Sequence, residues 1–157
     1  KARLVAEHFA LLHSLDSLKL AGRLDRFAAE QNRALPVLLE LNVGGEESKA
    51  GWDASDDSRW DALLPDVGAI LDLPNLRVHG LMTMPPLEID PNDARRFFQR
   101  LRLLRDHLAS AFPQADWREL SMGTSADYPV AVEEGATLVR VGTAIVGARR
   151  YKSEKEA

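Results

Sequence analysis

Cysteine is absent from the 157-residue chain, which excludes a disulfide framework and a thiolate metal site. A surplus of positive charge is absent too, since the formal net charge is -4 with 28% charged residues. Domains that bind a nucleic-acid backbone normally carry a basic surplus, so this balance argues against nucleic acid as a partner. One segment does concentrate arginines, and we interpret them as the solvated face of a helix: Arg95, Arg96, Arg100, Arg102 and Arg105.

Long apolar runs are also missing. Runs such as Pro36 to Leu41 and Ala144 to Val146 fall far short of the ~20 residues that a membrane span needs. The opening segment, Lys1 to Ala10, mixes charged with apolar residues and does not match a signal peptide. With 45% apolar residues, the chain is long enough for one domain with a core and too short for two. We expect a soluble, cytoplasmic protein with no membrane partner.

Short apolar segments alternate with helical patterns along the chain. Strands are predicted at residues 11–15, 36–43, 76–82, 119–122 and 137–141. Helices are predicted at 17–31, 57–71, 92–112 and 127–134, with a turn or short helix at 142–147 and a polar tail at 152–157. No Asn-Gly or Asp-Gly hairpin signal interrupts this order. The alternation therefore indicates βαβ units and a parallel sheet, an α/β fold.

Two architectures fit this alternation: an open doubly wound sheet and a (β/α)8 TIM-type barrel. The G-x-G-x-x-G fingerprint that would support a dinucleotide-binding open sheet does not occur. Small and hydroxyl-bearing residues gather instead after the last two predicted strands, where a TIM-type barrel commonly binds phosphate. The barrel is the fold that we expect.

Two segments could hold an anion: Ser121-Met-Gly-Thr-Ser125 and Val139-Arg-Val-Gly-Thr-Ala-Ile-Val-Gly147. Each places small residues between a strand and a helix, where N–H groups can approach an anion and the helix dipole adds roughly +0.5 charge. Ser125 and Thr143 each add a hydroxyl donor. The same residue types cap helices in α/β proteins that bind nothing there, so both interpretations stay open.

Arg140 lies within an otherwise apolar strand, where a charge is costly unless it is paired. Facing inward, two residues before Gly142, it could reach the far side of a ring bound there. Alternatively, it forms a buried ion pair with an acid from a neighbouring strand. The four histidines, His8, His13, His79 and His107, show no metal-binding spacing, so no metal site is expected.

The chain resembles the pyridoxal-phosphate homeostasis proteins, the YggS/PLPBP-like family. Its two anion segments, extended to Asp127 and Arg149, look like the closing signature of that family. Three blocks nearer the N-terminus also resemble that family and stand in the family's order: His13-Ser-Leu-Asp16, Leu39-Glu-Leu-Asn42 with Glu47-Ser-Lys-Ala-Gly51, and Gly80-Leu-Met-Thr-Met-Pro85. The resemblance runs from Lys1 to about Tyr151, and five blocks in sequence order make it specific.

This resemblance implies a barrel related to the alanine racemase N-terminal domain, with pyridoxal 5′-phosphate bound through a first-strand lysine and its phosphate near the seventh and eighth strands. Ser125, Gly142 and Thr143 would hold the phosphate. Ser121, Gly123 and Thr124 would shape the loop beside it. Arg140 would face the pyridine nitrogen, Asn42 and Met82 would line the ring, and Lys49 would be a family loop residue.

The sequence is expected to begin after the third strand, so that residues 1–151 carry strands four to eight of one barrel domain. None of the lysines, Lys1, Lys19, Lys49, Lys152 and Lys155, stands in a first-strand context, so covalent attachment of the cofactor is not expected. An arginine at the pyridine nitrogen weakens the ring as an electron sink. Alanine racemases tolerate such an arginine, but they also bring a second domain that carries a tyrosine base, for which this sequence leaves no room, so we expect a non-catalytic carrier. The alternatives are an amino-acid racemase-type enzyme and a fragment that binds nothing.

Five strands of eight cannot close a barrel, because closure ties strand number to tilt and shear. The inward faces of Leu39, Leu41, Val78 and Val139 are therefore expected to be open to water. We expect either N-terminal strands or a second chain to cover them.

Overall fold

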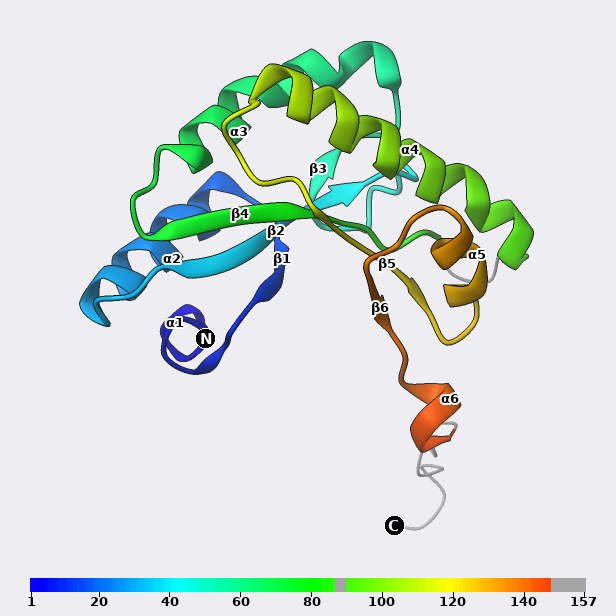
Figure 1. Ribbon diagram of the computed structural model, residues 1–157, viewed down its shortest axis with the longest axis horizontal. Helices are drawn as coiled ribbons and strands as arrows, with labels where there is room; N and C mark the ends of the chain where they lie inside the picture. Colours follow the sequence, from blue (N-terminus) through cyan, green and yellow to red (C-terminus); the bar gives the residue numbers. More distant parts are fainter. Residues whose placement is uncertain (87–89, 148–157) are drawn as a thin grey trace.

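The fold is built on parallel strands that neighbour one another in chain order. A computed structural model describes residues 1–86 and 90–147. The strands are β1 (Leu12–Leu15), β2 (Leu35–Asn42), β4 (Leu76–Met82), β5 (Glu119–Thr124) and β6 (Leu138–Arg140), in the spatial order β1-β2-β4-β5-β6 (Figure 1). All pair in parallel, which confirms the predicted sheet. The order lacks the reversal of an open doubly wound sheet and matches a partial barrel.

One strand was not predicted. The two-residue β3 (Trp52–Asp53) pairs in parallel with the end of β2, at Leu41 and Asn42. Two residues carry no detectable periodicity, so the sequence predicts only a loop there. The pairing holds the loop that follows β2 against the end of the sheet.

The helices follow the predicted ranges closely: α2 (Leu18–Glu30), η1 (Asp57–Leu63), α3 (Leu64–Leu71), α4 (Pro91–Ala111), α5 (Tyr128–Glu133) and α6 (Thr143–Val146). The predicted helix 57–71 is divided into the 3-10 helix η1 and α3. Pro65 lies in the first turn of α3, where its missing N–H is tolerated but an unbroken α-helix would need that donor. A further helix, α1 (Ala2–His8), was not predicted; Ala2 and Val5 pack against the core.

A single apolar core lies between the strands and helices α2 to α5. Leu35, Val37, Leu39 and Leu41 of β2 all belong to it. Because side chains alternate along a strand, Leu38 and Glu40 face the opposite side of the sheet, which we call the inner face.

The expectation that Leu39, Leu41 and Val78 face inward and lie open to water is therefore wrong. Their exposed fractions are 1%, 3% and 6%, and all three pack under the helices. A one-residue error of phase assigns every side chain of a strand to the wrong face. Val139 is 40% exposed, but it alternates with Arg140, whose guanidinium contacts Ser121 and Thr83, so Val139 too faces away from the inner face.

The β4 and β5 backbones approach each other closely at Gly80. A Cβ atom at this position would lie 1.9 Å from the carbonyl oxygen of Glu119, and the φ angle of Gly80 is +147°. The register between β2 and β4 also shifts here, between Val37 and Leu38. Glycine is required at this irregularity because any side chain would collide with the neighbouring strand.

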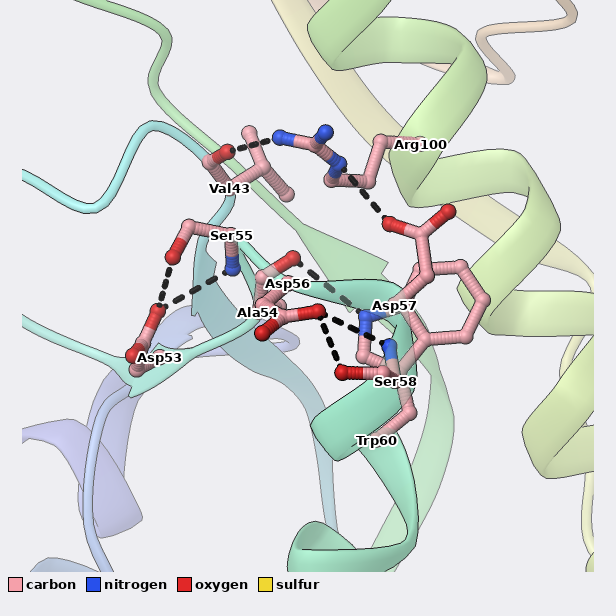
Figure 2. A network of polar contacts seen from close by, with 9 residues as sticks. All are labelled: Val43, Asp53, Ala54, Ser55, Asp56, Asp57, Ser58, Trp60 and Arg100. Carbon is pink, nitrogen blue, oxygen red and sulfur yellow. Dashed lines mark hydrogen bonds and ion pairs between the residues drawn. The ribbon is translucent and has the colours of Figure 1, made fainter.

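Two polar tethers fix α4 to the rest of the fold. The Glu134 carboxylate, after α5, accepts hydrogen bonds from Arg95 (2.8 Å) and Gln99 (3.1 Å) of α4. At the other tether Arg100 donates to the carbonyl oxygen of Val43 (3.0 Å) and to the carboxylate of Asp57 (3.2 Å), as Figure 2 shows. Together they hold the ends of β2 and α5 at set positions relative to α4.

The acidic loop beside the second tether is locally folded. Asp53 accepts hydrogen bonds from the backbone N–H and the hydroxyl of Ser55, and Asp56 accepts the same pair from Ser58 (Figure 2). The Ser55 bonds lower the pKa of Asp53. These carboxylates therefore close turns of the loop before η1.

Part of the sequence-based prediction cannot be compared with the structure. The polar tail 152–157 and the family residues at 148, 149 and 151 lie outside the described residues. Within the described ranges, every helix is too short or too polar to cross a membrane.

Candidate functional site

The two predicted anion segments meet at the C-terminal ends of β5 and β6. A hollow of about 1000 Å³ opens there. Its lining contains five of the nine predicted site residues, Thr124, Ser125, Arg140, Gly142 and Thr143, together with Met84, Ala126 and Ala144. A hollow of about 310 Å³ near the start of β4, beside His79 and Asp116, contains none of the nine.

Ser125 joins the two segments directly. Its hydroxyl oxygen accepts hydrogen bonds from the N–H groups of Gly142 (3.1 Å) and Ala144 (3.2 Å). The N–H group of Thr143, at the start of α6, has no partner among the described residues. A Cβ atom on Gly142 would meet nothing within 4 Å, so the space beside this turn is open. Converging donors beside open space are what an anionic oxygen requires.

Gly123 and Thr124 shape the turn below the hollow. The Asp127 carboxylate accepts hydrogen bonds from the N–H (2.6 Å) and the hydroxyl (2.9 Å) of Thr124. Gly123 has a φ angle of +92°, and a Cβ atom on it would lie 2.6 Å from the Cβ of Ala131. Glycine thus allows α5 to pack directly on β5.

Arg140 lies at the wall of the hollow, held by three oxygen atoms. Its Nη1 donates to the carbonyl oxygen (3.0 Å) and the hydroxyl (2.8 Å) of Ser121, and its Nη2 donates to the carbonyl oxygen of Thr83 (2.9 Å). The alternative of a buried ion pair is not found: among the described residues no carboxylate lies within 4.0 Å of this guanidinium. Burial lowers the pKa of Arg140, and the charges of Asp127 and Glu40 oppose that shift.

A third side chain joins this network from the far edge of the sheet. The Nδ1 of His13, on β1, lies 2.8 Å from the hydroxyl oxygen of Ser121, which is fully buried. Burial and the charge of Arg140 lower the pKa of His13, while Glu119 raises it. The sequence placed His13 in a family block but gave no sign of this contact, because the two partners are 108 residues apart.

The remaining predicted residues, Asn42 and Met82, do not line the hollow. The Asn42 amide donates to the carbonyl oxygen of Glu46 (2.8 Å) and accepts from the N–H of Gly45 (2.9 Å), so it closes the loop after β2. Met82 is 3% exposed and lies between Glu40 and Ser121 in the strand register. Both positions are at the same end of the sheet as the hollow, one to two strands away.

Glu40 is a further charged residue of the inner face that the sequence did not single out. Burial and the nearby charge of Asp16 raise its pKa, and the charges of Arg140 and Lys49 lower it. The inner face therefore carries an imidazole, a carboxylate and a guanidinium on three different strands, at the end where the hollow opens.

The donors around the hollow match a phosphate-bearing ligand. Hydroxyl donors lie at Ser125 and Thr143, an N–H donor lies at Thr143, and a fixed cation lies at Arg140. Among the described lining residues none carries an imidazole, carboxylate, thiol or phenol group that could transfer a proton. The arrangement is suited to binding and offers no acid–base group of its own.

Comparisons with known proteins agree with the family resemblance seen in the sequence. The family described as alanine racemase, N-terminal domain, matches residues 1–150. The pyridoxal phosphate homeostasis protein of Aquifex aeolicus is 42% identical over 151 residues, which cover 96% of this chain and 63% of that protein. The protein of that name from Escherichia coli is 35% identical over 154 residues, 98% of this chain and 62% of its own length. The chain thus spans less than two thirds of these relatives.

Solved structures show the same relationship in three dimensions. PipY of Synechococcus elongatus without PLP aligns with a TM-score of 0.82 and 41% identity, over 94% of this chain and 66% of PipY. The structure of PipY with PLP bound gives 0.80 and 39%, over 94% and 65%. Alanine racemase of Clostridium difficile, at 15% identity and a TM-score of 0.68 over 98% and 37%, shares the fold.

Proposed function

The chain belongs to the family of alanine racemase N-terminal domains, and on that premise we propose that it binds pyridoxal 5′-phosphate as a non-catalytic carrier in vitamin B6 homeostasis. The observation that carries the proposal is the junction of the two turns by Ser125 beside the fixed guanidinium of Arg140. Relatives named pyridoxal phosphate homeostasis proteins, and PipY with PLP bound, support it.

The phosphate of the ligand would lie at the turn after β6. Gly142 leaves room for an oxygen atom to approach the backbone, and the N–H of Thr143 is without a partner among the described residues. The hydroxyls of Ser125 and Thr143 would donate to the phosphate oxygens. No lysine is needed, because several neutral donors together stabilise an anion.

The ring of the ligand would lie toward Arg140. Bound pyridoxal phosphate supplies an aldehyde that condenses with amines and a ring that withdraws electrons. Arg140 is always a donor, so it would donate to the ring nitrogen and keep that nitrogen unprotonated. With no acid–base group among the described lining residues, we propose holding and release of the cofactor rather than its use in catalysis.

We further propose that the five long strands correspond to strands four to eight of an eight-stranded barrel, and that residues 1–151 belong to one such domain followed by a polar tail. The consecutive strand order and the position of the anion turns at the last two strands support this correspondence. Further strands or a second chain would cover the inner face, and the protein would act in the cytoplasm.

Substitution at Gly142 tests the assignment of the phosphate position. In a protein that also carries the further strands proposed above, Gly142→Leu should weaken pyridoxal 5′-phosphate binding by about tenfold or more, because the side chain fills the space of the anion. Gly22→Leu is the matched control: it adds the same side chain on α2, where nothing lies within 4 Å. Affinity is read by fluorescence titration and folding by circular dichroism. A folded Gly142→Leu protein with unchanged affinity would overturn the proposal.

A further inference from the structure

The Ser121 hydroxyl forms hydrogen bonds with two side chains, Arg140 and His13, and it has a different donor or acceptor role toward each. Arg140 has only donors, so the hydroxyl oxygen must accept its Nη1–H. A hydroxyl carries one proton, and the other side-chain partner among the described residues is the Nδ1 of His13 at 2.8 Å. The bonds are all satisfied when Ser121 donates its proton to Nδ1, which requires a neutral His13 with its proton on Nε2.

Protonation of His13 would reverse this bond. The imidazolium carries a proton on Nδ1, so the Ser121 oxygen would face two cationic donors, and its own proton would lose its acceptor. Ser121 is fully buried, which makes an unsatisfied hydroxyl costly there. The rearrangement that relieves this conflict is rotation of the hydroxyl and withdrawal of Arg140.

Two charges act on His13 directly, and a third acts on the same network. Arg140 of β6 disfavours the imidazolium and Glu119 of β5 favours it. Glu40 of β2 interacts with Arg140 and with Asp16 beyond the end of β1, and so acts on the same network. The two remaining bonds of Arg140 go to the backbone oxygens of Ser121 and Thr83, which do not titrate. His13, whose pKa is lowered, and Glu40, whose pKa is raised, are thus the two groups of this network whose charge can change on the acid side of neutrality, and His13 is the one that contacts Ser121.

We infer that His13 is a positioning residue whose neutral ring, acting through Ser121, aligns Arg140 for the ligand, and whose protonation releases Arg140 and weakens binding. This inference rests on the proposed function, in which Arg140 contacts the ring of pyridoxal 5′-phosphate. It adds a control to that site: the protein retains its ligand at neutral pH and releases it as the pH falls.

The tautomer can be tested without any ligand. In ¹⁵N NMR spectra of the full chain at neutral pH, Nδ1 of His13 should be unprotonated and Nε2 protonated. Arg140→Gln removes a positive charge from the network, so it should raise the pH at which His13 titrates. A His13 protonated on Nδ1 at neutral pH, or one whose titration is unmoved by Arg140→Gln, overturns the inference.

Ligand binding gives the second test. His13→Asn places an amide oxygen near the position of Nδ1 but does not titrate, so it should bind pyridoxal 5′-phosphate within about twofold of the wild type at about pH 8. Between about pH 8 and pH 5.5 the wild type should lose more affinity than His13→Asn, because only the wild type takes up a proton on this ring. The excess loss should stay below about tenfold, since the pKa of His13 is lowered from its ordinary value. The ligand's own titration affects both proteins equally, so it cancels when their affinities are compared at each pH.

The outcomes separate the inference from the proposed function. If Arg140→Gln binds pyridoxal 5′-phosphate as tightly as the wild type, the assignment of Arg140 in the proposed function is wrong. If Arg140→Gln binds weakly while His13→Asn and the wild type show the same pH profile, only the role of His13 is wrong. Circular dichroism melting curves of each variant confirm that it is folded.

Discussion

Glu134 is buried and Glu40 is half-buried, and their surroundings shift the pKa values of the two carboxylates in opposite directions. Glu134 lies among cationic and amide donors of α4, and its bonds to Arg95 and Gln99 and the nearby Arg102 lower its pKa. Glu40 lies on the inner face, where burial and Asp16 raise its pKa. Each difference from the unfolded chain makes the stability of the fold depend on pH.

Removal of Glu134 should destabilise the fold. Glu134→Ala leaves Arg95, Gln99 and Arg102 without a shared acceptor, and we expect the free energy of unfolding to fall by about 1–3 kcal/mol. Urea denaturation measures the change. Glu133→Ala is the matched control, since its side chain is 61% exposed and also pairs with Arg95; it should lower the stability by less than about 1 kcal/mol. Equal losses of stability in the two variants would show that Glu134 is not a buried acceptor shared by Arg95, Gln99 and Arg102.

Glu40 should make the fold less stable as the pH rises. Its folded pKa lies above its ordinary value of 4.5, so the native state binds the proton more tightly than the unfolded state, and its contribution is lost as the pH rises through the folded pKa. Glu40→Gln removes this loss. The melting temperature of Glu40→Gln relative to the wild type should therefore increase from pH 4.5 to neutral pH. A constant difference across that range would show that Glu40 is not perturbed.

At the scale of elements, α4 shows how one helix covers the sheet. Its buried side chains recur along one face: Ala94, Phe97, Phe98, Leu101, Leu104 and Leu108. The side chains on the opposite face are exposed, among them Leu103 at 51%. The helix therefore contributes to stability through one stripe of apolar contacts.

Two adjacent leucines of α4 provide a sharp comparison. Leu104 is fully buried, so Leu104→Ala should lower the free energy of unfolding by about 2–5 kcal/mol. Leu103→Ala removes the same atoms from an exposed position and should change it by less than about 0.5 kcal/mol. Chemical denaturation of both variants measures the difference. Similar losses would mean that Leu104 is not packed in the core while Leu103 is exposed.

The sequence predicted those elements whose pattern is long enough to be periodic. The 21 residues of α4 repeat their apolar positions several times, and β2 is apolar at every position except Glu40 and Asn42. In contrast, α1 has seven residues and β3 only two. Elements this short are fixed by tertiary contacts, as with Val5 against the core, which no local pattern reveals.

The candidate site was predictable to the same extent. The two turns and Arg140 could be proposed because each is a local pattern at the end of one predicted strand. The resemblance to pyridoxal phosphate homeostasis proteins is confirmed by relatives about 40% identical. The contact of His13 with Ser121 was missed because it joins two strands that are not neighbours in the sheet. Such contacts depend on how the sheet curves, which a sequence pattern does not specify.

At the scale of the whole molecule, β1 and β6 are the two edges of the described sheet. Along one side of each strand, the backbone N–H and C=O groups have no partner strand among the described residues. Near the β6 edge, Ile145 and Val146 of α6 are 76% and 82% exposed. Open strand edges beside apolar side chains favour association with another chain.

A polypeptide of these 157 residues alone should therefore self-associate. Sedimentation velocity should show species larger than the 17.4 kDa monomer. Replacing both Ile145 and Val146 by Lys should shift the distribution toward the monomer, because two charges oppose burial of that surface. Replacing Lys19 by Arg on α2 keeps the charge and serves as a control. A wild-type chain that stays monomeric and melts cooperatively would contradict the expectation.

The close approach at Gly80 has a consequence for how this protein tolerates change over many generations. Residue 80 touches no proposed ligand, yet a side chain there would lie 1.9 Å from the backbone of β5, and backbone atoms cannot move aside as a flexible side chain can. Saturation mutagenesis at this position should leave glycine alone among the folded variants, whereas Ser125 should tolerate threonine in a folded protein. The least replaceable residue of the chain would then be one that has no chemical role, and ranking positions by their resistance to substitution would point away from the site.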